Sequence, residues 1–229
     1  MKEKITYLKK YRKDVQIILK DFNQIGDIPL IWKNILKQSD MTDRIEETIK
    51  LWNRYMGLQF RNTIMYLKEK LVGIDLIKCG EKYSLLYSVL SSSNRILYYE
   101  GGNPNNKLLS GGLEKEWGSF HNSIVNFYEN LHDGFFYYAS KSMGLLPAQD
   151  IVFFDDEDWG IIDELEEPLG ICLATTFGIF ASGMGGYVAI DTSKCDKSKA
   201  VLWFTNRQPR YDIDFWDIVD EWTVIGMQG

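Results

Sequence analysis

Three groups of residues in this sequence of 229 residues have the types and spacing to bind a ligand or do chemistry. The first is a glycine-rich stretch, GIFASGMGGYVAID, at 178–191. A phosphate-binding P-loop needs Lys and then Ser or Thr directly after its last glycine, whereas Tyr187 and Val188 follow Gly186 here. Because glycines permit positive φ and close packing, we expect this stretch to be a turn between two strands.

The second group is an acidic run that contains one tryptophan and no basic residue. Its members are Asp155, Asp156, Glu157, Asp158, Trp159, Asp163, Glu164, Glu166 and Glu167. One alternative is a solvated surface, and another is a calcium loop, although the run lacks the alternating ligands and the Glu at the twelfth position of an EF-hand. We predict a partner-binding surface, on which the carboxylates attract a basic protein and Trp159 acts as a buried anchor beside Tyr137 and Tyr138.

The third group comprises the residues from which a catalytic site could be assembled. Ser-His-Asp chemistry would need His121 or His132, which we expect at the two ends of one helix, in solvent and away from any Gly-x-Ser-x-Gly turn. No spacing in the acidic run selects the facing carboxylate pair of a glycosidase. The three cysteines form no CxxC pair, which argues against a zinc ribbon. We therefore expect no enzyme, no metal and no cofactor; a small hydrolase would require a pocket where two carboxylates converge.

The net charge of −6 is unevenly distributed along the chain. Residues 1–80 hold 16 Lys and Arg against 10 Asp and Glu, whereas residues 120–229 hold 6 against 18. An acidic half of this kind repels nucleic acid and attracts basic partners. We therefore expect two structural parts with different surfaces.

The elements that must position these residues change in kind along the chain. In an N-terminal helical region, 1–80, apolar residues at steps of three and four predict helices over 3–23, over 30–37 and from Asp40 or Thr42 to Gly73. A connecting segment, 81–116, contains a predicted hairpin of two short strands, YSLLYSVL at 83–90 and RILYYE at 95–100.

The remaining segment, 117–229, alternates helices and strands. We expect a helix that ends near Gly134, strands at 186–193 and 200–206 joined by a polar turn, and a closing helix over 211–226. The fold class predicted for the whole chain is α+β, an antiparallel-rich sheet flanked by helices with an N-terminal helical extension.

The order of several stretches in this last segment resembles a known superfamily. These stretches are FYENLHDGF, the GLLP turn, GIFASGMGGYVAID, AVLWF and FWDIVDEW. Over roughly residues 117–226 they are similar to the SUKH superfamily, which includes the fungal Smi/Knr regulators of cell-wall synthesis. The long N-terminal helical region is a departure from the minimal domain of that superfamily.

The resemblance implies a function in binding proteins. Bacterial members are mostly immunity proteins that bind and neutralise toxins of polymorphic or contact-dependent systems, so the partner expected here is a basic protein toxin, for example a nuclease. The alternative is a regulatory scaffold like the fungal members. No apolar run approaches the 18 or so residues of a membrane span, and we expect a cytoplasmic protein that contacts neither membrane nor nucleic acid, with a homo-oligomer left open.

Overall fold

The computed structural model describes residues 2–229, and over this range the chain forms seven α-helices and one antiparallel sheet of 11 strands. The helices are α1 (Lys2–Leu8), α2 (Leu30–Leu36), α3 (Met41–Met56), α4 (Arg61–Lys70), α5 (Gly111–Glu116), α6 (Asn122–Asn126) and α7 (Phe215–Gln228). The strands are β1 (Gln16–Ile18), β2 (Leu71–Cys79), β3 (Lys82–Leu90), β4 (Ile96–Gly102), β5 (Phe135–Tyr137), β6 (Ser142–Leu145), β7 (Val152–Phe153), β8 (Thr176–Ala181), β9 (Gly186–Asp191), β10 (Lys199–Phe204) and β11 (Arg207–Asp214). The α+β class with a large antiparallel sheet is confirmed.

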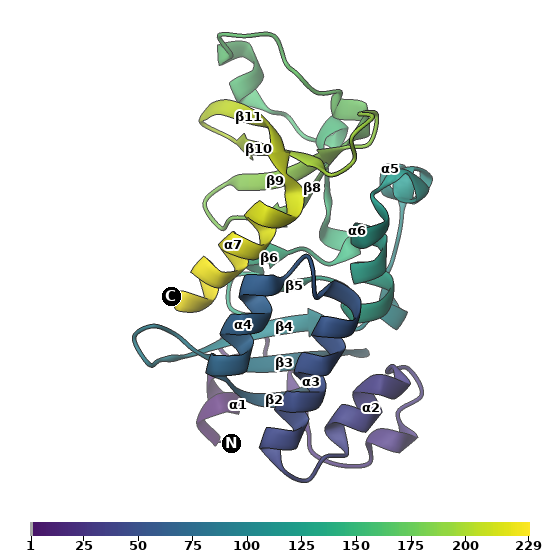
Figure 1. Cartoon of the computed structure of the whole chain (residues 1–229), viewed down its shortest axis with the longest axis vertical. Helices are drawn as coiled ribbons and strands as arrows, with labels where there is room; N and C mark the ends of the chain where they lie inside the picture. Colours follow the sequence, from purple (N-terminus) through teal and green to yellow (C-terminus); the bar gives the residue numbers. More distant parts are fainter. Residues whose placement is uncertain (1) are drawn as a thin grey trace.

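The sheet has two halves that short strands join. Neighbouring strands follow the order β1-β2-β3-β4-β5-β6-β8-β9-β10-β11, with β7 paired to β8 at the side. We call β1–β4 the N-terminal half and β8–β11 the C-terminal half; β5 and β6, of three and four residues, connect them. Figure 1 shows the N-terminal half at one end of the molecule and the C-terminal half at the other. No helix within residues 2–229 is both long and apolar enough to cross a bilayer.

The N-terminal half is covered on both faces because its strands alternate two sets of buried side chains. Leu76 and Tyr87 belong to the main core, to which α2, α3 and α4 contribute, whereas Ile77 and Leu86 pack with Leu8 at the end of α1. Successive residues of a strand point to opposite faces, so two apolar sets in one strand require a layer on each side. Figure 1 shows α3 and α4 in front of β2–β4.

The C-terminal half of the sheet is also covered on both faces, by different elements. Val188 and Leu202 belong to the main core together with Val219 of α7. Their strand neighbours Ala189 and Trp203 point to the other face and pack in a separate cluster with residues from the segment between β7 and β8. That segment contains the acidic run, so the sheet itself fixes where the run lies.

Two of the predicted N-terminal helices differ from those observed. The helix predicted over 3–23 was wrong beyond Leu8, because the chain turns there and Gln16–Ile18 pairs with β2 instead. The single helix predicted from 40 to 73 is two helices, α3 and α4, and β2 begins at Leu71. The short helix α2 and the hairpin β3–β4 form as predicted.

Helix α7 connects the two halves of the sheet by packing against elements of both. It starts directly after β11 and packs on α4 and β6. Helix α4 follows Phe60, a residue with no capping side chain, and its first N–H groups would lack partners. The buried carboxylate of Asp220 in α7 supplies them, accepting hydrogen bonds from the backbone N–H of Asn62 at 2.9 Å and of Thr63 at 2.8 Å.

Replacing this capping carboxylate is expected to destabilise the whole molecule. Asp220→Ala leaves the N–H groups without acceptors and should lower the free energy of unfolding by about 2–4 kcal/mol in denaturant titrations. Asp220→Asn keeps one acceptor oxygen and should lose about half as much. The exposed Glu221→Ala, one residue along the same helix, is the control, and an equal loss in Asp220→Ala and Glu221→Ala would contradict this role.

Candidate functional site

The acidic segment, residues 155–167, occupies the end of the molecule farthest from the N-terminus (Figure 1). It leaves β7, passes through two short 3-10 turns, Phe154–Asp156 and Gly160–Glu164, and returns towards β8. All eight of its carboxylate side chains are exposed. The five side-chain ion pairs found within residues 2–229 include none of them. The segment therefore presents a block of uncompensated negative charge to solvent.

Trp159 holds the acidic segment in place. Its side chain is only 9% exposed, and its Nε1 donates a hydrogen bond to the Phe154 carbonyl oxygen at 2.9 Å. Its ring lies 4.7 Å from the Phe154 ring and 5.2 Å from the Trp203 ring between centroids. Aromatic pairs at this spacing stabilise a fold beyond the effect of their buried area. This packing therefore fixes the position of the segment on the sheet. The charged side chains that the segment leaves exposed to solvent are its carboxylates.

The neighbours predicted for Trp159 were wrong. Tyr137 lies in β5, where its hydroxyl pairs with that of Tyr7 at 2.9 Å, and Tyr138 packs beneath Arg12. Both tyrosines belong to the part of the sheet next to β4, whereas Trp159 packs on β9 and β10. They lie apart from Trp159 because β6 and β8 separate β5 from β9 in the sheet.

The glycine-rich stretch is a hairpin turn, as predicted. Residues 182–185 join β8 to β9, and Gly183 and Gly185 take φ of +79° and +76°. The Ser182 hydroxyl accepts a hydrogen bond from the Gly186 N–H at 3.1 Å. This bond and the positive φ of the two glycines close the turn, which is a structural role for the glycines.

A second group of charged residues meets in a polar cavity of about 190 Å³ beside β4. Arg12, from the turn after α1, forms an ion pair of 2.6 Å with the buried Glu100 of β4. Asp133, which precedes β5, is also buried in the wall of this cavity. Two buried carboxylates, Glu100 and Asp133, thus line one pocket together with the exposed Asp150. The small-hydrolase alternative requires carboxylates in such a pocket. This cavity was not predicted from the sequence, in which its one signal is Glu100, a carboxylate in an otherwise apolar strand.

Burial controls the charge of Asp133. Removal from water raises the pKa of its carboxyl to about 6, although the N–H of Ala148 donates a hydrogen bond to Oδ1 at 2.8 Å and Lys82 and Lys107 favour the charged form. Perturbed carboxyls of this kind are typical of functional sites, because the ionised form is costly for folding alone. The cavity is therefore the second candidate site.

The neighbouring His132 is buried, so the prediction of an exposed position at the helix end was wrong for it. Its Nε2 lies 2.7 Å from the Tyr87 hydroxyl, which in turn accepts from Trp52 Nε1. Burial lowers the pKa of His132 to about 3, so the ring is neutral. Its ring occupies the space that a side chain at Gly101 would need, within 2.5 Å of an added Cβ. His121 is exposed at the start of α6 as predicted.

Comparisons of this chain with protein-family models, curated proteins and solved structures find no match. The resemblance to the SUKH superfamily stays a prediction that rests on the order of the quoted stretches. Within residues 2–229, no three His, Cys, Asp or Glu side chains are grouped as ligands of a metal ion.

The shifted pKa values of Asp133 and His132 predict opposite effects of pH on the free energy of unfolding. Asp133 has a folded pKa above its unfolded value, so its contribution to stability is lost as pH rises from about 4 to about 6; the loss is about 2–3 kcal/mol. His132 has a folded pKa below its unfolded value, so its contribution is lost as pH falls below about 6.5. In the native chain the two effects offset each other in part.

The substitution Asp133→Asn separates the effect of Asp133 on stability from that of His132. Asparagine keeps the acceptor for the Ala148 N–H without a charge, so the variant should match the native chain at pH 4 and exceed its free energy of unfolding by about 2 kcal/mol at pH 7. Asp150→Asn, an exposed carboxylate of the same cavity, is the control. A loss of stability in Asp133→Asn at pH 7 would contradict the buried-charge account.

Proposed function

We propose that this protein binds a basic protein partner through its acidic segment, and that the partner is a toxin which the complex neutralises. One observation carries the proposal: eight exposed carboxylates, none paired with a cation in the part of the chain that the structure describes, stand on a segment that buried Trp159 and Ile161 fix to the sheet. A fixed array of like charge has a cost in self-repulsion that a partner of opposite charge removes.

The arrangement suits fast and specific capture of a basic surface. Clustered charge of one sign raises association rates by about 10-fold to 1,000-fold at low salt. Because the aromatic packing already fixes the segment, binding loses less conformational entropy than binding by a mobile loop would. A nuclease toxin needs a basic cleft to hold phosphates, and an acidic protein seated there would exclude nucleic acid.

The toxin is the partner suggested by the resemblance to SUKH immunity proteins. A regulatory scaffold related to the fungal members is the alternative and uses the same surface on an endogenous basic protein. Co-expression distinguishes the two: under the proposal, cells that express the partner toxin survive only when this chain is present.

Hydrolysis at the polar cavity is a second candidate, favoured by the raised pKa of Asp133 in a cavity that Glu100 also lines. A carboxyl with a pKa of about 6 can donate or accept a proton near neutral pH. Under this candidate, Asp133→Asn abolishes turnover of glycoside and ester substrates while it stabilises the fold. Absence of turnover in the native chain, or equal turnover in the variant, removes this candidate.

Neutralising part of the acidic segment is expected to slow association with the partner. The variant carries Asp155→Asn, Asp156→Asn, Glu157→Gln and Asp158→Asn. Its association rate constant should fall about tenfold at low ionic strength, and the dependence of that rate on salt should flatten. Stopped-flow mixing with the purified partner over a salt series measures both quantities.

A matched variant separates position from total charge. It neutralises four exposed carboxylates elsewhere, with Asp43→Asn, Glu46→Gln, Glu69→Gln and Glu114→Gln. Because the net charge changes equally, a local role for the acidic segment predicts a much smaller effect here. Equal slowing in both variants, or none in the first, would rule out the acidic segment as the contact surface.

A further inference from the structure

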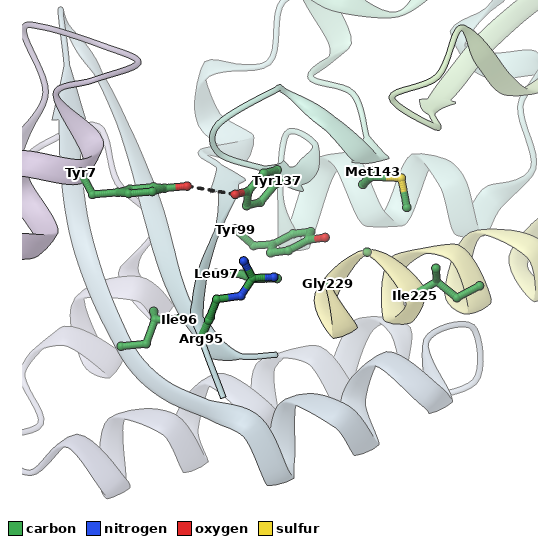
Figure 2. Close-up of a pocket in the computed structure, with 10 residues that line it drawn as sticks. Tyr7, Arg95, Ile96, Leu97, Tyr99, Tyr137, Met143, Ile225 and Gly229 are labelled. Carbon is green, nitrogen blue, oxygen red and sulfur yellow. Dashed lines mark hydrogen bonds between the residues drawn. The ribbon is translucent and has the colours of Figure 1, made fainter. Parts of the chain in front are cut away.

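A groove of about 580 Å³ lies between α1, β4 and the end of α7, and none of its lining residues belongs to the acidic segment (Figure 2). Three tyrosines line it: Tyr7 of α1, Tyr99 of β4 and Tyr137 of β5. Met143 of β6 and Ile225 of α7 add apolar wall. The volume falls in the range of small-molecule sites, and the mixture of apolar wall with a few polar atoms is typical of them.

The hydroxyl of Tyr99 has no partner in this groove. Its side chain is fully buried, and its oxygen makes no hydrogen bond among the residues that the structure describes. The hydroxyls of Tyr7 and Tyr137 bond to each other and leave Tyr99 alone. Burial raises the pKa of Tyr99, so its hydroxyl stays protonated and can donate to an incoming acceptor. Buried hydroxyls without a partner are rare in folded proteins.

Arg95 supplies the charge of the groove. It is the one charged side chain among the described residues that line it, and its Nε donates to the Ser93 hydroxyl at 3.0 Å. None of the five ion pairs in residues 2–229 includes it. A neighbouring hollow along α1 shares Arg95 and adds Lys2 and Lys10 against a single carboxylate, Glu3. The groove therefore has mainly apolar walls and one cationic side chain, Arg95, with Lys2 and Lys10 in the neighbouring hollow.

We propose that this groove binds a small organic acid with an apolar body, whose anionic head contacts Arg95 and accepts a hydrogen bond from Tyr99. A guanidinium group binds a carboxylate or phosphate with two parallel N–H donors, and the ring faces and the Met143 and Ile225 side chains cover an alkyl or aromatic body. An alcohol of the same length has the same apolar body but no charge, so it should bind more weakly. This site is separate from the acidic segment and does not depend on the partner proposed above.

Isothermal titration of the full chain with decanoate tests the proposal. We expect one saturable site with a dissociation constant of about 0.1–1 mM. Arg95→Gln should weaken binding at least about tenfold and Tyr99→Phe about threefold to tenfold, because one removes a charged donor and the other a neutral one. Arg61→Gln, an exposed cation at the start of α4, should change nothing. Decanol should bind at least about tenfold more weakly than decanoate.

Two outcomes would overturn the proposal. One is the absence of saturable decanoate binding, or binding that Arg95→Gln and Tyr99→Phe leave unchanged. The other is cosedimentation of the chain with phosphatidylglycerol vesicles, lost in Arg95→Gln, without binding of free decanoate; this would assign the cation to a lipid surface. Tyr99→Phe removes a single oxygen atom, and Arg95→Gln changes an exposed side chain. Thermal denaturation of each variant verifies that it is folded.

Discussion

The bond from Asp220 to the start of α4 is the constraint on which the arrangement of the molecule depends. Only β5 and β6 carry the sheet from one half to the other, and strands of three or four residues offer few hydrogen bonds. Helix α7 crosses this narrow region, and its buried carboxylate satisfies two backbone donors of the opposite half. A buried carboxylate held by two N–H groups has one favourable geometry, so it fixes where α7 lies on α4.

This geometry separates the charges of the molecule. The basic residues of the first 80 positions gather around the N-terminal half, and the acidic segment stands on the C-terminal half at the opposite end. The ligands proposed for these two surfaces are accordingly of opposite charge, an anion for the groove beside Arg95 and a basic protein for the acidic segment. A single sheet with different layers on its faces accommodates both, because each layer packs against its own set of alternating side chains.

The sequence predicted those features that depend on local pattern. The hairpin of β3 and β4, the short helix α2 and the glycine turn at 182–185 follow from residue types within each stretch. The helix predicted over 3–23 failed because Gln16–Ile18 gains a partner in β2, and tertiary pairing overrides a weak helical periodicity. The polar cavity could not be predicted, since Arg12, Glu100 and Asp133 meet only through the pairing of distant strands. The exposure of the acidic run was predictable from its composition, whereas the burial of Trp159 against Trp203 was not.

Amide hydrogen exchange, measured on the chain alone and in complex with its partner, tests the central claim that the acidic segment is the contact surface. The account predicts that complex formation slows exchange within residues 154–171 and at the adjoining β10 and β11, with little change in α2, α3 and α4. Slowed exchange confined to those helices, with the acidic segment unchanged, would contradict it.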